Sequence, residues 1–510
     1  MAIMNSNLPN SPSEPTNAEA VDPFGVRGGQ GSLKRQSLRG SLATFLAQAI
    51  KMVIQIGSQV VLARLLFPAE YGLVAMAYPV VSFLQVFNDI GLGQAIVQRP
   101  VLEQKQVSAL FWLNLGVSFL LGLSVILISP LAAWAYGEHR LILLLVVLSI
   151  TMPIAGINVV PIALLTRQMR FVLTARNEII AALCGAVVTV VCALKGFSYW
   201  SLVAGQLALL VIGNILGWLA VGWRPSSPRQ LPAIWNDVKF GANITISNLA
   251  TFVTTSADNV IVGLATGKVA LGLYDRSYNL VVRPINQLTS PINRIAIPLL
   301  SRLVDQPEKY RSAYLQMTRV ATLLLLPAML VGISNATTLV RVLLGPRWPE
   351  AAPIFSWLCV GGLASGVYAS GFWLLISQDR TRELRHLTLV AAVINVASFL
   401  IGIAWGVVGV AIGASLSFAL LTTPLLLFGA TRSGPVRPRD FLSFAAPFAF
   451  AGIVTYGVLV FGLRQVALPG VMRLVVVTLV SYTLVTALCL ISAENRRLFG
   501  RTTQLLKDVR

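Results

Sequence analysis

The sequence predicts an all-α polytopic membrane protein of about fourteen transmembrane helices, arranged as two pseudo-repeated six-helix lobes plus two C-terminal helices. Three observations predict this fold: the composition, a series of apolar runs, and an alternation of basic loops. The chain has 510 residues, of which 56% are hydrophobic and 11% charged, and its mean hydropathy is +0.76. Soluble globular chains carry roughly a quarter charged residues. This composition is therefore typical of helices surrounded by lipid.

Apolar runs long enough to cross a bilayer follow one another along nearly the whole chain. A spanning helix needs roughly 20 such residues, or somewhat more when it is tilted. The predicted spans are 41–63, 73–96, 107–129, 141–165, 177–195, 198–222, 240–265, 270–300, 314–340, 351–377, 385–404, 407–430, 441–463 and 471–492.

The segments between the spans define the predicted domain organisation. The first residues are rich in Pro, Asn, Ser and Gly and have no apolar core, so we expect a disordered tail and not a signal peptide. The longest loop, RPSSPRQLPAIWNDVK, is expected to link the two lobes. The predicted units are a cytoplasmic tail at 1–35, an N-terminal lobe at 36–223, a linker at 224–239, a C-terminal lobe at 240–430, two additional helices at 431–495 and a basic cytoplasmic tail at 496–510.

Lys and Arg concentrate in alternate loops. Groups such as Arg167, Arg170 and Arg176 recur on one side, whereas the opposite loops hold mostly single charges such as Arg64. Because positively charged loops stay in the cytoplasm, both termini are expected there. The net charge of +20 is scattered over these loops and forms no single basic face, which argues against nucleic acid as a partner. The cysteines and histidines form no metal-ligand pattern, so neither a metal nor a resident cofactor is expected.

The chain matches itself when it is shifted by 200 positions. The segment 58–81 aligns without gaps to 258–281, which pairs Gly72 with Gly272 and Tyr78 with Tyr278. A polar helix face also recurs in the same register. It comprises Gln48, Lys51, Gln55 and Ser58 in the first half and Asn248, Thr251, Thr255 and Asp258 in the second. The two halves are therefore predicted to be parallel repeats around a central cavity.

Polar residues spaced by three or four share one face of the helix predicted over 270–300. These residues are Arg276, Asn279, Arg283, Gln287, Ser290 and Arg294. They extend over roughly 27 Å, nearly the thickness of the hydrocarbon layer. An arginine at the bilayer centre costs at least about 2.5–3.5 kcal/mol, so the stripe should face a hydrated cavity or a polar partner. Arg276 and Arg294 lie near the helix ends and can reach the interface, whereas Arg283 lies too deep.

Four further charges are predicted within the membrane. Lys51 either contacts substrate or pairs with an acid such as Asp258. Asp258, Asp89 and Asp275 are candidates for ion coupling or charge pairing; Asp89 is expected to form a local cap or pair, and Asp275 to lie beside a nearby cation.

A cationic cavity implies an anionic substrate, and the planar arginine fork suits a diphosphate. The candidate binding residues are Arg283, Arg276, Arg294, Lys51, Gln287 and Asn279.

Two segments carry a resemblance to a known family: LARLLFPAEYGLVAMAYPVVSFLQVFNDIGLGQAIVQRP (62–100) and ADNVIVGLATGKVALGLYDRSYNLVVRPINQLTSPINRIAIPLLSRL (257–303). They resemble the signature regions of bacterial polysaccharide transporters, the Wzx-type flippases of the multidrug/oligosaccharidyl-lipid/polysaccharide exporter superfamily. The resemblance covers about 36–495 and implies a V-shaped pair of lobes plus two C-terminal helices. It implies transfer of undecaprenyl-diphosphate-linked oligosaccharides to the outer leaflet of the bacterial inner membrane. It also implies cationic cavity residues in the first, second and eighth helices and coupling to a proton or sodium gradient, although the second helix has no cation at depth.

The sequence therefore predicts a non-enzymatic flippase that works by alternating access. The alternative is a cation-coupled small-molecule exporter of the same fold, which would favour an acid-lined cavity. A membrane enzyme is not expected, because the opposite-side loops are too short for a catalytic domain and the P-loop motif is absent. The expected partners are the lipid-linked oligosaccharide, membrane lipid, and a polysaccharide polymerase with its export machinery; the chain is expected to be a monomer. Strict sugar selection would need a defined pocket, which the sequence does not locate.

Overall fold

The computed structural model describes residues 30–88, 93, 96–97, 102–227, 235–462 and 469–491, and these contain helices and no strand. For 30–43, 45, 235–255 and 442–443 the description is limited to the backbone. The N-terminal lobe consists of α1 (Gln30–Leu65), α2 (Pro68–Gln85), α4 (Gln104–Tyr136), α5 (Arg140–Ser149), α6 (Thr151–Arg167), α7 (Phe171–Leu194) and α8 (Trp200–Val221).

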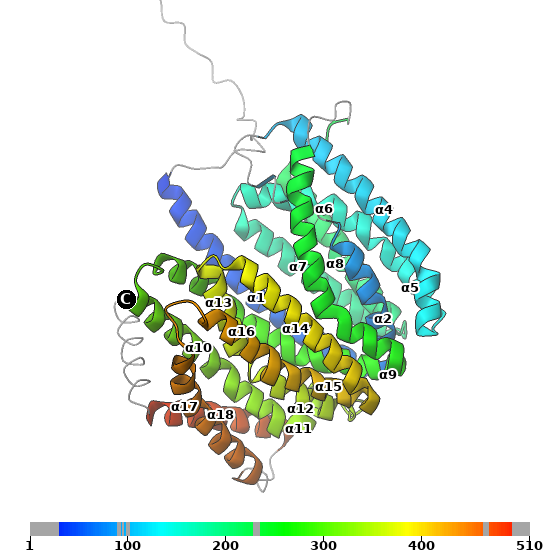
Figure 1. The fold of residues 1–510 in the computed structure, drawn as a ribbon. Coiled ribbons are helices and arrows are strands. Elements are labelled where there is room, and N and C mark those ends of the chain that lie inside the picture. The colour runs from blue at the N-terminus through cyan, green and yellow to red at the C-terminus, as the bar shows by residue number, and fades with distance from the viewer. Residues whose placement is uncertain are drawn as a thin grey trace, which may run out of the picture.

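The C-terminal lobe begins with one very long helix and continues through shorter ones. It consists of α9 (Trp235–Arg302), α10 (Pro307–Ser334), α11 (Ala336–Leu343), α12 (Ala351–Gly362), α13 (Ser365–Ser377), α14 (Thr381–Gly402), η1 (Ile403–Trp405), α15 (Gly406–Leu416), η2 (Ser417–Thr422) and α16 (Thr423–Thr431). Two further helices, α17 (Pro438–Gly457, extended by η3, Val458–Gly462) and α18 (Gly470–Ile491), pack against α10. Figure 1 shows the two lobes side by side, with α17 and α18 at the edge of the C-terminal lobe.

The all-helical membrane fold predicted from the sequence is confirmed. Ten stretches of the described residues are long and apolar enough to cross a membrane. One of them, Thr381–Thr431, covers two predicted spans, which the turn at Gly406 separates. Three predicted spans are outside these ten: 73–96, of which 73–85 lies on α2, and 240–265 and 270–300, which lie on α9. The count of about fourteen therefore stays a prediction.

Helical structure begins earlier than the predicted unit boundaries. Helix α1 starts at Gln30, inside the range expected to be a disordered tail, and α9 starts at Trp235, inside the expected linker. Residues 1–29 of the predicted tail 1–35, residues 228–234 of the predicted linker and the whole predicted tail 496–510 lie outside the described residues. So do the side chains of Asn248, Thr251 and Thr255, on which the repeated polar face partly rests.

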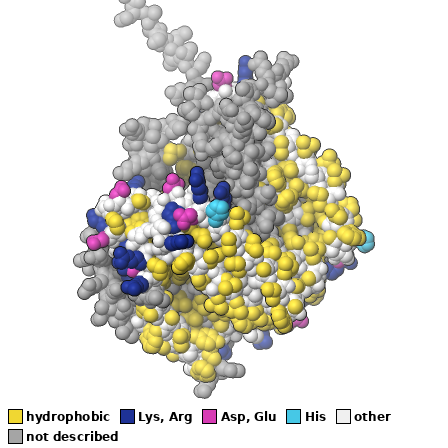
Figure 2. All heavy atoms as spheres, in the orientation of Figure 1, with side chains coloured by type: hydrophobic (Ala, Val, Ile, Leu, Met, Phe, Trp, Pro, Cys, Tyr) yellow, Lys and Arg dark blue, Asp and Glu magenta, His cyan; other side chains and the backbone are white. Residues whose placement is uncertain are grey.

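The helices follow from the absence of competing water in a bilayer, where backbone groups must be paired within the chain. Pro68, Pro307 and Pro438 occupy the first turn of α2, α10 and α17, where a missing N–H costs no helix bond. Figure 2 shows a broad apolar surface over both lobes. Trp134 and Phe461, for example, are each 78% exposed. A surface of this kind is suited to lipid and is rare on soluble monomers.

Helix α9 is a hairpin of two helical arms that reverses at Gly267. Gly267 has φ 78° and ψ −176°, a conformation that favours glycine. The Tyr274 hydroxyl donates a hydrogen bond to Asp258 Oδ2 at 3.0 Å. In a straight helix these residues would lie roughly 24 Å apart along the axis, so the chain must double back between them. The repeat alignment pairs Gly267 with Phe67, the residue that separates α1 from α2.

The lobes meet chiefly where α2 lies against the second arm of α9. Two glycines permit this approach, and their surroundings are reciprocal. A Cβ atom at Gly72 would collide with the backbone carbonyl of Lys268, and one at Gly272 would collide with the carbonyl of Pro68. Since Lys268 and Pro68 are themselves a pair in the 200-residue alignment, the contact lies on a pseudo-two-fold axis between the repeats.

The glycine contact is expected to tolerate no side chain. Gly272→Ala would force the two backbones apart, which typically costs about 1–3 kcal/mol in a well-packed interface. We expect a lower midpoint of thermal unfolding for the purified protein in detergent. Gly116→Ala in α4 is the matched control, because a Cβ there meets nothing within 4 Å and alanine favours a helix over glycine. Equal melting of Gly272→Ala, Gly116→Ala and the unchanged protein would contradict the assignment.

Candidate substrate cavities

One end of the space between the lobes is closed by contacts around the turns, which we call the interlobe seal (63–72, 136–138, 263–276 and 341–348). Trp348 inserts its buried indole between the lobes and donates to the Ala63 carbonyl at 2.7 Å. Its ring also meets the Tyr71 ring edge-on, with centroids 5.5 Å apart. Arg64 donates to the Val342 carbonyl at 3.1 Å, and Arg347 donates to the Leu65 carbonyl at 3.1 Å.

An ion pair crosses the same seal. The Lys268 ammonium donates to Glu138, which lies in the turn between α4 and α5. This hydrogen bond and the charge of Lys268 hold the pKa of Glu138 below its usual value of 4.5. Because the pKa of Glu138 is lowered, its ion pair with Lys268 stabilises the folded protein fully at pH values above the ordinary carboxyl pKa. That stabilisation is lost as the pH falls through the lowered value.

Reversing one charge of this pair should loosen the seal. In Lys268→Glu two carboxylates face each other. We expect amide hydrogen exchange in 263–276 to accelerate by up to about fivefold, because a partly exposed pair is worth at most about 1 kcal/mol. The double variant Glu138→Lys/Lys268→Glu should restore slow exchange, whereas Arg382→Glu, at the exposed start of α14, should have no effect. Fast exchange in the double variant would show that the pair does not hold the lobes together.

Next to the seal lies an interlobe cavity of about 180 Å³. Its N-terminal wall is polar but uncharged, and its C-terminal wall carries charge. The polar and charged lining residues are Gln55, Ser58, Gln59, Tyr71, Tyr78, Thr189 and Gln206 from the N-terminal lobe, and Asp275, Arg276 and Arg283 from the second arm of α9. The arginine stripe predicted from the sequence therefore does border a cavity in its first half.

Arg276 is bound on both sides within this cavity. Its guanidinium lies 2.7 Å from Asp275 Oδ2 and 4.4 Å above the Tyr71 ring of the other lobe. Only about a sixth of its side chain is exposed. An arginine held by a carboxylate and an aromatic face is mostly neutralised, so Arg276 contributes to the seal more than to an open anion site.

Arg283 is the accessible cation of the cavity. Its Nε donates to Asn279 Oδ1 at 3.0 Å, and Asn279 in turn donates to the backbone and side chain of Asp275 at 2.7 and 3.0 Å. The side chain is exposed, and no carboxylate among the described residues forms a salt bridge with it. Pro284 follows directly and has no N–H to donate to the Leu280 carbonyl. The free edge of the guanidinium is therefore available to an anion.

The remaining residues of the stripe lie farther along α9. Gln287 is half-buried and Arg294 is exposed, and neither lines the interlobe cavity. The structure thus brings together Arg276, Asn279 and Arg283, and it separates Gln287 and Arg294 from them. Pro284 and Pro291 lie between Arg283 and Arg294, and each removes one helix hydrogen bond from this part of α9.

Lys51 has an acidic partner that the sequence reasoning missed. Its Nζ lies 2.5 Å from Glu178 Oε2 on α7. Lys51 is about one turn from the lining residue Gln55, and Glu178 is about one turn from Ala182 on the same face of α7. The pair therefore continues the N-terminal wall of the cavity. The spacing of Glu178, Ala182, Gly185 and Thr189 was the available signal for a cavity-facing acid.

Asp258 is separate from Lys51. It is 5% exposed and accepts hydrogen bonds from Tyr274 Oη and from the Asn259 amide. The alternative in which Lys51 pairs with Asp258 is therefore wrong in this arrangement. Asp89, the third candidate acid, lies outside the described residues.

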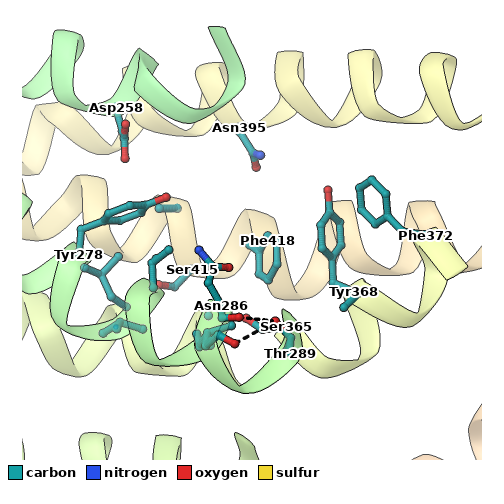
Figure 3. A pocket seen from close by; sticks show the side chains of 18 of the residues that line it. Asp258, Tyr278, Asn286, Thr289, Ser365, Tyr368, Phe372, Asn395, Ser415 and Phe418 are labelled. Carbon is teal, nitrogen blue, oxygen red and sulfur yellow. Dashed lines mark hydrogen bonds between the residues drawn. The ribbon is translucent and has the colours of Figure 1, made fainter. Parts of the chain in front are cut away.

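A second and larger cavity of about 630 Å³ lies within the C-terminal lobe, between α9, α12, α13, α14, α15 and η2. Figure 3 shows Asp258 and Asn395 facing it from one side, with Tyr278, Asn286 and Tyr368 facing it from the other. Its lining combines aromatic and aliphatic side chains with asparagine amides and hydroxyls. Its residues are scattered over 258–418, so no local pattern in the sequence marks them.

Two lobes, an end seal and a polar cavity between the lobes define a multi-span membrane transport protein. The same fold occurs in the lipid II flippase MurJ in an inward closed conformation, with a TM-score of 0.71 and 13% identity over 89% of this chain and 98% of MurJ. It also occurs in an inward-facing multidrug resistance MATE transporter, with a TM-score of 0.59 and 16% identity over 76% of this chain and 98% of that chain.

The chain belongs to the family described as "Polysaccharide biosynthesis protein", whose model matches residues 61–353. It is 24% identical over 396 residues to the lipopolysaccharide biosynthesis protein WzxC of Escherichia coli K12, covering 76% of this chain and 79% of WzxC. It is 25% identical over 397 residues to the teichuronic acid biosynthesis protein TuaB of Bacillus subtilis, covering 73% of this chain and 82% of TuaB. It is 29% identical over 301 residues to the succinoglycan biosynthesis transport protein ExoT of Rhizobium meliloti, covering 59% of this chain and 61% of ExoT.

Proposed function

We propose that the protein is a flippase that moves undecaprenyl-diphosphate-linked oligosaccharides across the bacterial inner membrane. The observation that carries this proposal is the accessible guanidinium of Arg283 in a cavity between two lobes. A diphosphate offers paired anionic oxygens, which match the donor fork of an arginine. The prenyl chain would remain in lipid outside the lobes, and the lobes would rock about the glycine contact to expose the cavity alternately.

Family membership supports polysaccharide precursors as the cargo. Relatives named for lipopolysaccharide, teichuronic acid and succinoglycan synthesis share the helical body, and one is named a transport protein. On this proposal the chain is a transporter and not an enzyme. The fold alone does not separate a lipid flippase from a small-molecule exporter, since it occurs in both. Arg283 does separate them, because it would repel the cationic drugs that an acid-lined cavity attracts.

The direction of opening follows from loop charge on the same proposal. The interlobe seal lies at the turns that carry few Lys and Arg, so the positive-inside rule puts it on the outer side. The cavity would then open toward the cytoplasm, and both termini would lie there. The expected partners are a polysaccharide polymerase and export machinery, with a single copy of the chain as the working unit.

Ion coupling is the part of the proposal that rests on Asp258. A buried carboxyl without a cationic partner among the described residues is a natural acceptor for a proton or a sodium ion. It lies on the first arm of α9, whereas Arg283 lies on the second. Occupancy of Asp258 would therefore act on the same hairpin that carries the anion site. Asp275, already bonded to Arg276 and Asn279, is proposed to hold these two side chains in place.

Loss of the Arg283 guanidinium should abolish most transport. A charged hydrogen-bond pair is worth about 1.5–3 kcal/mol, so Arg283→Ala should lower polysaccharide export from cells by about 10- to 100-fold at equal protein level. Arg283→Lys keeps the charge without the fork and should retain partial export. Arg302→Ala, at the exposed end of the same helix, is the matched control. Normal export by Arg283→Ala would overturn the proposed site.

Glu178 should compete with the substrate for Lys51. Glu178→Gln releases the ammonium, so we expect purified protein to bind undecaprenyl diphosphate up to about fivefold more tightly, the value of a partly exposed ion pair. Lys51→Gln should weaken the same binding, while Glu103→Gln, at the exposed start of α4, should not change it. Unchanged binding in both cavity variants would remove Lys51 from the anion site.

A further inference from the structure

The C-terminal-lobe cavity has the chemistry of a site for an uncharged, hydroxyl-rich ligand. Its volume of about 630 Å³ falls within the roughly 300–1,000 Å³ typical of small-ligand pockets. Aromatic rings form much of the wall: Tyr368 lies 4.7 Å from Phe418 and 5.2 Å from Phe372 between ring centroids. The amides of Asn286, Asn293 and Asn395 add donors and acceptors.

The cavity wall is mostly apolar, carries amide and hydroxyl groups at intervals, and is nearly free of charge. Among its described lining residues, Asp258 is the single ionised type, and it is bonded to Tyr274. A prenyl chain would leave the amides and hydroxyls of this wall unpaired, which costs roughly 1–3 kcal/mol for each group. An anion would meet Asp258 and no cation. Both of these parts of a lipid-linked substrate therefore fit the cavity poorly.

Three polar side chains in the cavity make no hydrogen bond to other described residues. They are the side-chain amide of Asn286 and the hydroxyls of Tyr278 and Tyr368, and all three point into the cavity (Figure 3). Asn293, by contrast, is fixed by a 2.7 Å hydrogen bond from the Trp373 indole. The wall thus combines rigid aromatic surfaces with unused donors and acceptors.

The mouth of this cavity lies next to the proposed diphosphate site. Asn286 is exposed and is three residues from the exposed Arg283. Residues three apart on a helix have Cβ atoms roughly 5–6 Å apart. The second arm of α9 therefore borders both cavities, with Arg283 lining one and Asn286 lining the other. In a lipid-linked glycan the first sugar is bonded directly to the diphosphate, so a phosphate at Arg283 would bring that sugar to Asn286.

We propose that the C-terminal-lobe cavity binds the neutral sugar residues nearest the diphosphate, with Asn286 and Tyr368 donating to sugar hydroxyls and the aromatic rings packing against the C–H face of the ring. This inference rests on the proposed flippase function and assigns its sugar-recognition site. Sugar rings carry hydroxyls at the edge and C–H groups on the faces, which matches a wall of amides and aromatic rings. Selection of the glycan then occurs beside the anion site and not within it.

The test compares binding of undecaprenyl diphosphate with that of the same lipid carrying glucose, galactose or N-acetylglucosamine, using purified full-length protein in detergent. At least one sugar should increase affinity over the bare lipid. Asn286→Ala and Tyr368→Phe should each reduce that gain by about three- to tenfold, the effect of one lost hydrogen bond. Neither variant should change binding of the bare lipid, and Gln306→Ala, in the exposed connection after α9, should change nothing. Arg283→Ala should weaken all four lipids by the same factor.

The outcomes separate the inference from the function on which it rests. If the unchanged protein binds bare undecaprenyl diphosphate but no sugar adds affinity, the sugar site is overturned and the flippase proposal stands. The same conclusion follows if the gain persists in both cavity variants. If the bare lipid does not bind at all, both proposals fail. Tyr368→Phe removes a single oxygen from a partly exposed ring, so loss of folding would not mimic the expected result.

Discussion

The close approach of Gly72 and Gly272 is the constraint on which the rest of the structure depends. Without a side chain at either position, the backbones of α2 and α9 touch across the pseudo-two-fold axis. This contact brings Trp348 within reach of the Ala63 carbonyl and Arg276 within reach of the Tyr71 ring. One end of the interlobe space is therefore fixed by main-chain packing, and the polar side chains of the cavity are arranged relative to that fixed end.

The electrostatics of the cavity follow from how each charge is compensated. Arg276 and Lys51 each have a carboxylate within 2.7 Å, so their charges are largely cancelled in a low-dielectric setting. Arg283 differs, because its described protein partner is the neutral amide of Asn279. Asp275 accepts a hydrogen bond from that amide and so orients it. Asp275 itself forms no salt bridge with Arg283 among the described residues, so the charge of Arg283 is not neutralised. An anion entering the cavity meets one unpaired guanidinium flanked by two paired cations.

The fold class, the repeat register and the position of Arg283 beside a cavity could be predicted from the sequence, because each depends on a periodic or compositional signal. Apolar length predicts a span, the 200-residue shift predicts the equivalence of Gly72 and Gly272, and three-to-four spacing aligns Arg276 with Arg283. The prediction failed to anticipate the pairing of Lys51 with Glu178, which joins residues 127 positions apart. The C-terminal-lobe cavity was missed for the same reason. Its lining comes from six elements, and side-chain packing across helices leaves no local signature.

The Lys51–Glu178 pair has a consequence for the unloaded protein. A carrier that releases its cargo must return through the membrane with an empty cavity, and an uncompensated ammonium would raise the energy of every intermediate arrangement. Glu178 supplies Lys51 with an internal counter-anion that, on the proposed function, would compensate the ammonium when no substrate is bound. The paired side chains together carry no net charge when the cavity is empty. On the proposed function, Glu178 would therefore influence how fast the empty carrier returns, and the substrate would have to displace it from Lys51 in order to bind.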